Sequence, residues 1–316
     1  MAIPPVAFVR RVGVLVLVVV VAALGLIGCG GAEDTAAPRP SPIPDTNSIV
    51  SAVVKDPALA AALPPQVAGS GSLRLATNLQ SPPNNFYAAD GRTPIGYEVD
   101  IAKAIAAKLG VRVEHQDADF SSLIPSLESG RVDLTMAAMN DTKEREARID
   151  FVDYFTSGIT IMVRKANPEQ ITEPDALCGK AVAAVQGTSN QRFAAEQSTE
   201  CARAGKPAVT IEATDSDARS EDELKTGRVS AVLNDLPSAS FAARTVADGA
   251  AFDVVPGQPL NGGPYGIGFA KSNRQLADAV RGALQALIDD GTYDRILTAW
   301  GLQQGALRKA AFNGAP

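Results

Sequence analysis

Few residues of this chain have the chemistry of a catalyst or a metal ligand. His115 is the single histidine, and the three cysteines form no Cys-x-x-Cys pair. The common zinc, haem and Ser-His-Asp sites need more of these residues than the chain contains. We therefore expect no metal and no cofactor, and we look for the chemistry of the site among charged and polar side chains.

Arg145 is the first such candidate, because a planar guanidinium can hold a carboxylate through two parallel hydrogen bonds. Asp141 and Glu144 have the spacing of a capping box, which predicts that Arg145 lies in the first turn of a helix. Free N–H groups in that turn also favour a negative charge. On spacing alone, an exposed arginine paired with Glu144 or Glu146 is the simpler interpretation.

Asp235 is the matching candidate for a cation. It ends the apolar run 231–233, so we expect it at the carboxyl edge of a strand. The alternative is an aspartate that caps a turn before Pro237. Thr188 follows Gln186 and Gly187 and offers a hydroxyl, although it could equally cap the helix that comes next.

The elements that must position these residues follow from the hydrophobic pattern. The 316 residues, 46% of them hydrophobic, suffice for two lobes. Ile101, Ile105 and Leu109 recur at helical spacing before Gly110. Strand–helix–strand alternation predicts a mainly parallel sheet, at whose carboxyl edge ligands bind. The predicted strands are residues 73–77, 111–114, 132–136, 181–185, 209–211 and 229–233.

A series of short motifs resembles the extracellular solute-binding proteins of family 3, which serve polar amino-acid ABC importers. The resemblance covers roughly residues 71–303 in unbroken order, and the series is more specific than any one stretch. The matching stretches are residues 96–105, 119–127, 141–145, 149–151, 179–182, 186–188, 233–235, 264–269 and 290–293.

The resemblance implies an α/β fold of the two-lobe, type II periplasmic-binding-protein kind. Each lobe would be a mainly parallel sheet flanked by helices, and two hinge strands, expected at 158–164 and 265–269, would join the lobes. The predicted parts are lobe 1 (71–160 plus 270–305), lobe 2 (161–269) and a C-terminal tail (306–316).

The resemblance also assigns roles to residues of the cleft. Arg145 would bind the α-carboxylate of an amino acid, Asp235 its α-ammonium group, and Thr188 would reach the same carboxylate from the opposite lobe. Phe120 would form an apolar wall, although packing at a helix entry is the alternative. Ala138, Asn140 and Asn78 complete the predicted site.

The side-chain pocket departs from the family pattern. Relatives usually carry aromatic residues where Ser81 and Asn84 stand, and binders of basic side chains often carry an acid in place of Asn78. A polar, uncharged pocket favours glutamine or asparagine, since a buried cation would find no carboxylate. Glutamate or aspartate is the second choice, with Arg74 as the donor. The candidates for the missing aromatic wall are Phe86 and Tyr87.

Three classes of function fit the predicted fold: a binding protein for transport, a ligand sensor and an enzyme. We expect a monomeric binding protein that delivers its ligand to an ABC permease, not an enzyme. A sensor would need a separate membrane partner. A relative of the cyclohexadienyl dehydratases would need a general acid, for which Asp235 or Glu98 lacks a titratable partner. A net charge of −6 without a Lys/Arg block argues against binding to nucleic acid.

The first residues predict export. Arg10 and Arg11 precede an apolar run at 12–27, too short for a typical membrane span. The run ends in a sequence that resembles a lipobox, which implies a signal peptide at 1–28 and a lipid on Cys29; an uncleaved anchor helix is the alternative. Residues 29–70 would be a proline-rich tether with a short extension, on the extracytoplasmic face of the cell membrane.

Export also predicts the state of the other two cysteines. With Cys29 acylated, Cys178 and Cys201 remain as a pair in an oxidising compartment, where a disulfide is expected. The bridge would close a loop of about 24 residues and contribute about 3 kcal/mol. Two buried free thiols are the alternative.

Overall fold

The computed structural model describes residues 43–316. The predicted signal peptide, the lipidation site at Cys29 and most of the tether therefore lie outside the described residues. Within residues 43–316, no helix has both the length and the apolar character that a membrane crossing requires.

Twelve strands and eleven α-helices make up the described chain. The strands are β1 (Ser72–Thr77), β2 (Gln80–Ser81), β3 (Asn85–Tyr87), β4 (Pro94–Ile95), β5 (Arg112–Asp117), β6 (Leu134–Thr135), β7 (Ile149–Arg164), β8 (Ala181–Val185), β9 (Thr210–Thr214), β10 (Ala231–Asp235), β11 (Phe252–Val254) and β12 (Leu260–Ala270). The helices are α1 (Asn47–Ser51), α2 (Pro57–Ala61), α3 (Pro65–Ser70), α4 (Tyr97–Leu109), α5 (Leu123–Glu128), α6 (Lys143–Glu146), α7 (Ser189–Arg203), α8 (Asp217–Thr226), α9 (Leu236–Thr245), α10 (Arg274–Asp289) and α11 (Thr292–Ala299).

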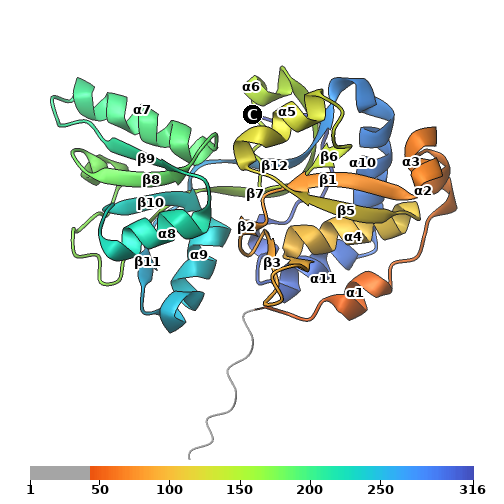
Figure 1. Cartoon of the computed structure of the whole chain (residues 1–316), viewed down its shortest axis with the longest axis horizontal. Coiled ribbons are helices and arrows are strands. Elements are labelled where there is room, and N and C mark those ends of the chain that lie inside the picture. Colours follow the sequence, from red (N-terminus) through yellow and green to blue (C-terminus); the bar gives the residue numbers. More distant parts are fainter. Residues whose placement is uncertain (1–42) are drawn as a thin grey trace, which may run out of the picture. The chain divides into compact units, whose positions relative to one another are not determined.

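One nine-stranded sheet runs through both lobes, in the order β5-β1-β6-β12-β7-β10-β8-β9, and β11 pairs with β7 (Figure 1). In the first lobe β1 pairs in parallel with β5 and β6. In the second lobe β8 pairs in parallel with β9 and β10. The predicted two-lobe α/β fold is confirmed, but the parallel strands of both lobes belong to one sheet, in which β7 adds antiparallel pairs.

The core of the first lobe forms where helices cover this sheet. The predicted helix over Ile101, Ile105 and Leu109 is α4, and all three side chains are buried. Gly110 ends this helix in the left-handed conformation that favours glycine. Helices α10 and α11 pack beside α4 and contribute Leu284 and other apolar residues to the same core.

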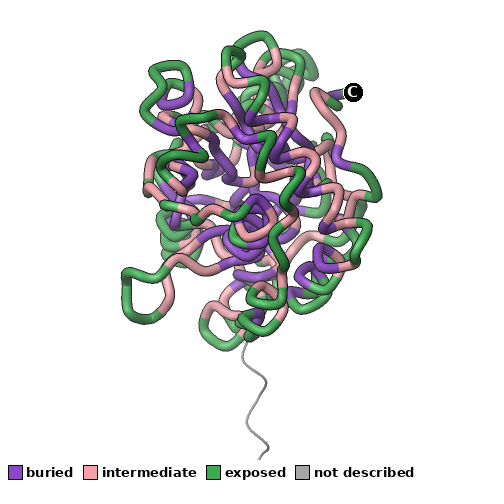
Figure 2. Tube along the Cα trace, turned by 90° about the vertical axis from the view of Figure 1, so that its right-hand side faces the viewer, coloured by how far each residue is buried: buried purple, intermediate pink, exposed green. Residues whose placement is uncertain are grey.

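The second lobe has apolar layers on both faces of its sheet. Alternate residues of β8 point to opposite faces: Val182 packs with Ala194 of α7, whereas Ala183 packs with Leu224 of α8. Buried positions run through the inner trace and exposed positions mark the outer turns (Figure 2). This packing fixes the carboxyl ends of β8, β9 and β10 at one edge.

The chain crosses between the lobes on two antiparallel strands, β7 and β12. Phe155 and Tyr265 pack in the first-lobe core, while Ile159 and Leu260 pack against the second-lobe core. The crossings therefore lie at residues 156–158 and 261–264. Both predicted crossings, 158–164 and 265–269, are therefore wrong. Ile159, Ile161 and Val163 are buried in the second lobe. Tyr265, Ile267 and Phe269 are buried in the first lobe.

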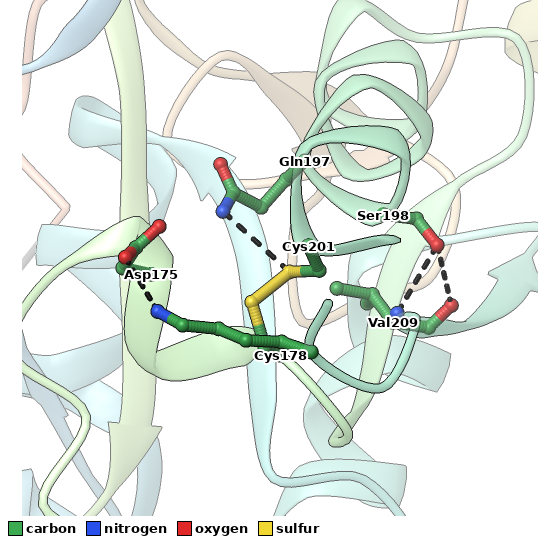
Figure 3. The surroundings of a disulfide bond; sticks show 7 residues. Asp175, Cys178, Gln197, Ser198, Cys201 and Val209 are labelled. Atoms are coloured by element: carbon green, nitrogen blue, oxygen red, sulfur yellow. Dashed lines mark hydrogen bonds and ion pairs between the residues drawn. A yellow bond between two sulfur atoms is a disulfide. The ribbon is translucent and has the colours of Figure 1, made fainter. Parts of the chain in front are cut away.

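A disulfide bond joins Cys178 to Cys201 in the second lobe (Figure 3). Cys178 precedes β8, and Cys201 lies near the end of α7. Next to the bond, the Ser198 hydroxyl donates to the Val209 carbonyl and accepts from its N–H group, both at 3.1 Å. These contacts fix the far end of α7 and leave its first residue at the opposite, carboxyl edge of the sheet.

The segments before and after the predicted lobes also pack on the first lobe. The Thr46 hydroxyl donates to Asp100 of α4 at 2.8 Å, and the Trp300 indole donates to the same carboxylate at 2.8 Å. Leu63 and Val67 belong to the first-lobe core. Near the C-terminus, the Asn313 side chain accepts from the N–H group of Phe151 in β7 at 2.7 Å.

Candidate functional site

A cavity lies between the two lobes, at the carboxyl edge where strands β1, β6, β8, β9 and β10 end. Residues of both lobes line it, and most of them are polar. The first lobe contributes Asn78, Ser81, Asn84, Phe120, Ala137, Ala138 and Asn140; the second contributes Val185, Thr188, Ser189, Asn190, Asp217, Leu233, Asn234 and Asp235. Every predicted ligand-binding residue except Arg145 is among them.

Arg145 lies beside the cavity and contacts both lobes. Its Nη1 donates to the Asn140 carbonyl at 2.8 Å, and its Nη2 donates to the Gly187 carbonyl of the second lobe at 3.2 Å. Its guanidinium carbon lies 5.5 Å from the centre of the Phe120 ring. Burial lowers the pKa of Arg145 to about 10, with a contribution from Arg192, so the group stays charged at neutral pH. The two hydrogen bonds use only part of its donors.

The local structure around Arg145 differs from the predicted capping box. Thr142, not Asp141, caps the four-residue helix α6, and its hydroxyl accepts from the Arg145 N–H group at 3.3 Å. Glu144 pairs with Arg192 at 3.1 Å and Glu146 with Lys143 at 3.2 Å. The cap therefore orients Arg145, while the neighbouring acids take other partners.

Asp235 ends β10 and has 7% of its surface exposed. Its side chain makes no capping hydrogen bond to α9, so the turn-capping alternative does not apply. Burial raises the pKa of Asp235 to about 7, and Asp217 adds to this, while Tyr265 and Asn190 favour the charged form. A cation that enters the cavity would favour the charged carboxylate and so lower the pKa of Asp235 again.

The side chains of Thr188 and Asn78 form hydrogen bonds within their own loops. The Thr188 hydroxyl donates to the Val185 carbonyl at 2.6 Å and accepts from the Gln191 N–H group at 3.2 Å, as a cap of α7 does. Asn78 accepts from the Gln80 N–H group at 3.1 Å. Both residues line the cavity wall. Of the two neighbouring hydroxyls, Thr188 and Ser189, that of Ser189 has no hydrogen-bond partner among the described residues.

Ala138 and Asn140 follow β6 on a segment held by a buried acid. Ala138 has a left-handed backbone with φ of 48°, which is uncommon for alanine. Its N–H group donates to Glu98 at 2.9 Å, and this carboxylate also accepts from Tyr154 and Asn85. Glu98 therefore supports the site from within the core and does not line the cavity.

Asp217 is the charged residue of the cavity lining that sequence reasoning missed. It is the first residue of α8, has 7% of its surface exposed, and accepts a hydrogen bond from the Ser81 hydroxyl of the other lobe at 2.6 Å. Burial raises the pKa of Asp217 to about 6. The expectation that the cavity has no carboxylate for a cationic side chain is therefore wrong. Its position just after β9 was the signal that could have found it.

Three other candidates lie elsewhere. Arg74 pairs with Asp133 at 2.6 Å and does not line the cavity. Phe86 packs against Phe241 and Trp300, with ring centres 6.1 and 6.2 Å apart. The Tyr87 hydroxyl is 3.4 Å from Asp117. Among residues 43–316 the cavity therefore has no second arginine for an acidic side chain, and neither ring replaces the missing aromatic wall.

Several buried polar atoms of the cavity residues lack a hydrogen-bond partner within residues 43–316. They are the Asn84 Oδ1, Asn190 Oδ1, Asn234 Nδ2 and Ser189 Oγ atoms. Buried polar groups are usually paired, and an unpaired one costs roughly 1–3 kcal/mol. A polar ligand in the cavity would be able to pair with them. No group of three or more acidic, His or Cys residues in the described chain is placed to hold a metal ion.

Comparison with known proteins shows the family of the chain. Residues 73–303 match the model of the bacterial extracellular solute-binding proteins, family 3. The arginine-binding protein ArgT of Corynebacterium glutamicum is 31% identical over 267 residues, which cover 84% of this chain and 86% of that protein.

Two solved structures are also similar. An ancestral arginine-binding protein bound to arginine is 35% identical, with a TM-score of 0.67 over 73% of this chain and 98% of that chain. AncCDT-1, an ancestral amino acid-binding protein described as a precursor of cyclohexadienyl dehydratase, is 29% identical, with a TM-score of 0.67 over 74% and 97%.

Proposed function

Since the chain belongs to the bacterial extracellular solute-binding proteins of family 3, we propose that it binds a polar L-amino acid between its lobes and delivers it to an ABC permease. The similarity to ArgT and to two ancestral amino acid-binding proteins supports this ligand class. Delivery to a permease is inferred from membership of this family, whose proteins serve ABC importers.

One observation carries the proposal: a cation and an anion from opposite lobes flank one cavity. Arg145 belongs to the first lobe and Asp235 to the second. A free amino acid carries a carboxylate and an ammonium group on the same carbon, and each group loses its hydration in a closed cleft. Charge-assisted hydrogen bonds to Arg145 and Asp235 would replace that hydration. A ligand held from both sides would stabilise the closed arrangement of the lobes.

We also propose that the protein works as a lipoprotein on the extracytoplasmic face of the membrane, anchored through Cys29. The apolar run and the lipobox-like sequence at 26–29 support this step. Intact mass of the membrane-extracted protein should show residues 1–28 missing and a lipid on Cys29. An unmodified, full-length chain would contradict the anchor and leave the ligand proposal untouched.

An enzyme of the cyclohexadienyl dehydratase type is the second candidate, and Asp217 is the observation that favours it. Asp217 and Asp235 both line the cavity, so a general acid has a titratable neighbour. Both carboxylates also have a simpler role as partners of a cationic ligand. Incubation of the protein with a cyclohexadienyl acid, followed by absorbance, would separate the two functions, because binding leaves the acid intact.

Calorimetry of the purified protein against the common L-amino acids tests the main proposal. We expect tight binding, with one ligand per chain, for at least one polar amino acid. The same titration with the D-enantiomer should give much weaker binding, since the two charged anchors have fixed positions. Binding to none of the L-amino acids, with the folded state verified by circular dichroism, would refute the proposal.

A further inference from the structure

We propose that Asp217 is the side-chain recognition residue of the cavity and that it selects an amino acid with a cationic side chain, a guanidinium or an ammonium group. This inference rests on the proposed function, because it assumes that Arg145 and Asp235 bind the two backbone charges of the ligand.

The position of Asp217 supports this role. It lines the cavity from the second lobe, and its neighbour across the cavity, Ser81, belongs to the first lobe. Ser81 donates to the Oδ2 atom, and the Asn234 side chain also favours the charged form of Asp217. A carboxylate can accept about four hydrogen bonds, so Asp217 retains acceptor capacity for a ligand.

The balance of charge leads to the same conclusion. The residues that line the cavity include Asp217 and Asp235 but no lysine or arginine, and Arg145 lies beside them. A zwitterion uses Arg145 and Asp235, which leaves the charge of Asp217 unpaired. A buried, unpaired carboxylate is strongly unfavourable, and a cationic side chain would neutralise it.

The other charged groups near Asp217 do not supply this cation. Glu221, one turn further along α8, is itself acidic and interacts unfavourably with Asp217. Arg219 on the same helix pairs with Glu223 at 3.0 Å. No described residue therefore supplies a positive charge to Asp217, and we assign this role to the ligand.

Two of the four unpartnered polar atoms of the cavity residues are acceptors that suit a ligand rich in donors, whereas Asn234 Nδ2 donates and Ser189 Oγ can do either. Asn84 and Asn190 have buried Oδ1 atoms without a partner in residues 43–316, and both residues line the cavity. These atoms accept hydrogen bonds, as Asp217 does. A guanidinium or ammonium group carries several N–H donors and no acceptor, so it can satisfy all of them.

Arginine and citrulline form the sharpest pair of ligands for a test, because citrulline has nearly the same shape and a neutral urea group. For the wild-type protein, calorimetry at neutral pH should give an affinity for arginine at least about 30-fold higher than for citrulline. In Asp217→Asn the preference should fall to within about threefold, mainly through weaker arginine binding. Asp222→Asn, an exposed change on the same helix, is the control and should keep the wild-type preference.

The outcomes separate this inference from the proposed function. Wild-type protein that binds citrulline or glutamine as tightly as arginine and lysine would overturn the role of Asp217 but keep amino-acid binding. An unchanged preference in a folded Asp217→Asn variant would also overturn it. Failure to bind any amino acid would refute the proposed function and this inference together. The wild-type comparison needs no variant, so a misfolded Asp217→Asn protein does not prevent the test.

Discussion

Arg145 donates hydrogen bonds to a carbonyl of its own lobe and to one of the opposite lobe, so its loss would affect the ligand and the lobe contact together. We expect Arg145→Ala to reduce the affinity for every amino acid by about 30-fold or more, because the α-carboxylate would be buried without its cation. Calorimetry with the tightest wild-type ligand measures this change.

Arg148→Ala is the matched control for Arg145→Ala. Arg148 is exposed and pairs with Glu128 at 2.7 Å, away from the cavity. An exposed ion pair contributes little, so ligand affinity should stay at the wild-type level. A folded Arg145→Ala protein that binds within threefold of wild type would show that the carboxylate is held elsewhere.

The sequence located some residues of the cavity and not others, for physical reasons. Asp235 could be placed because an apolar run marks the strand that it ends. Asp217 follows Ser216, and that pair is indistinguishable from an ordinary helix start. Only the fold brings Asp217 to Ser81, 136 positions earlier in the chain. The free hydroxyl of Ser189 was missed for a similar reason, since the choice between Thr188 and Ser189 depends on which one caps α7.

At the scale of elements, the spacing of apolar residues predicts whether a segment is a helix or a strand, but it does not predict the lobe in which that segment packs. Helix α4 and strand β8 follow directly from their patterns. Residues 265–269 lie on a strand, as the family resemblance implied, but the resemblance did not say which core receives their side chains. The short helices α1, α2 and α3 were expected only as an extension before the lobe. Their attachment depends on a few contacts, such as Leu63 in the first-lobe core.

The backbone at Gly158 of β7 lies close to the start of β12. A methyl group there would lie 2.8 Å from the Leu260 carbonyl oxygen and 2.8 Å from the Pro259 side chain. We expect Gly158→Ala to force the strands apart and to lower the free energy of unfolding by about 1–3 kcal/mol. Urea denaturation monitored by fluorescence measures this effect.

Gly263→Ala provides the control on the facing strand, because a methyl group at that position meets no atom within 4 Å. Its free energy of unfolding should stay close to the wild-type value. If both variants were equally stable, the close approach at Gly158 would not restrict the crossing.

At the scale of the whole molecule, buried acids make stability depend on pH. Burial raises the pKa of a set of carboxyl groups to about 6 or 7: Glu98, Asp141, Asp153, Asp217, Glu221 and Asp235. In the unfolded chain such groups titrate near 4. Between these values the folded state binds more protons, so its stability falls as pH rises from about 4 through about 7.

His115 acts in the opposite direction, since burial lowers its pKa to about 4. The contribution of the neutral His115 to the stability of the folded state is lost as pH falls from about 6.5 to about 4. The carboxyl groups outnumber this single histidine, so we expect the ligand-free protein to unfold at a higher temperature at about pH 5.5 than at about pH 7.5. Differential scanning calorimetry measures both temperatures, and a lower unfolding temperature at the acidic pH would contradict the prediction.

The attachment of residues 46–70 to the first lobe has a mechanical consequence. The described chain begins next to Thr46, whose hydroxyl meets the Trp300 indole at the carboxylate of Asp100. A pull applied to the N-terminal end is thus transmitted to α4 and α11, and it does not pass through β7 or β12. In the described chain those two strands are the only covalent connection between the second lobe and the first. If the chain is tethered at its N-terminal end, the tether holds the first lobe in place. The second lobe can then rotate about the crossing strands without any force from the tether.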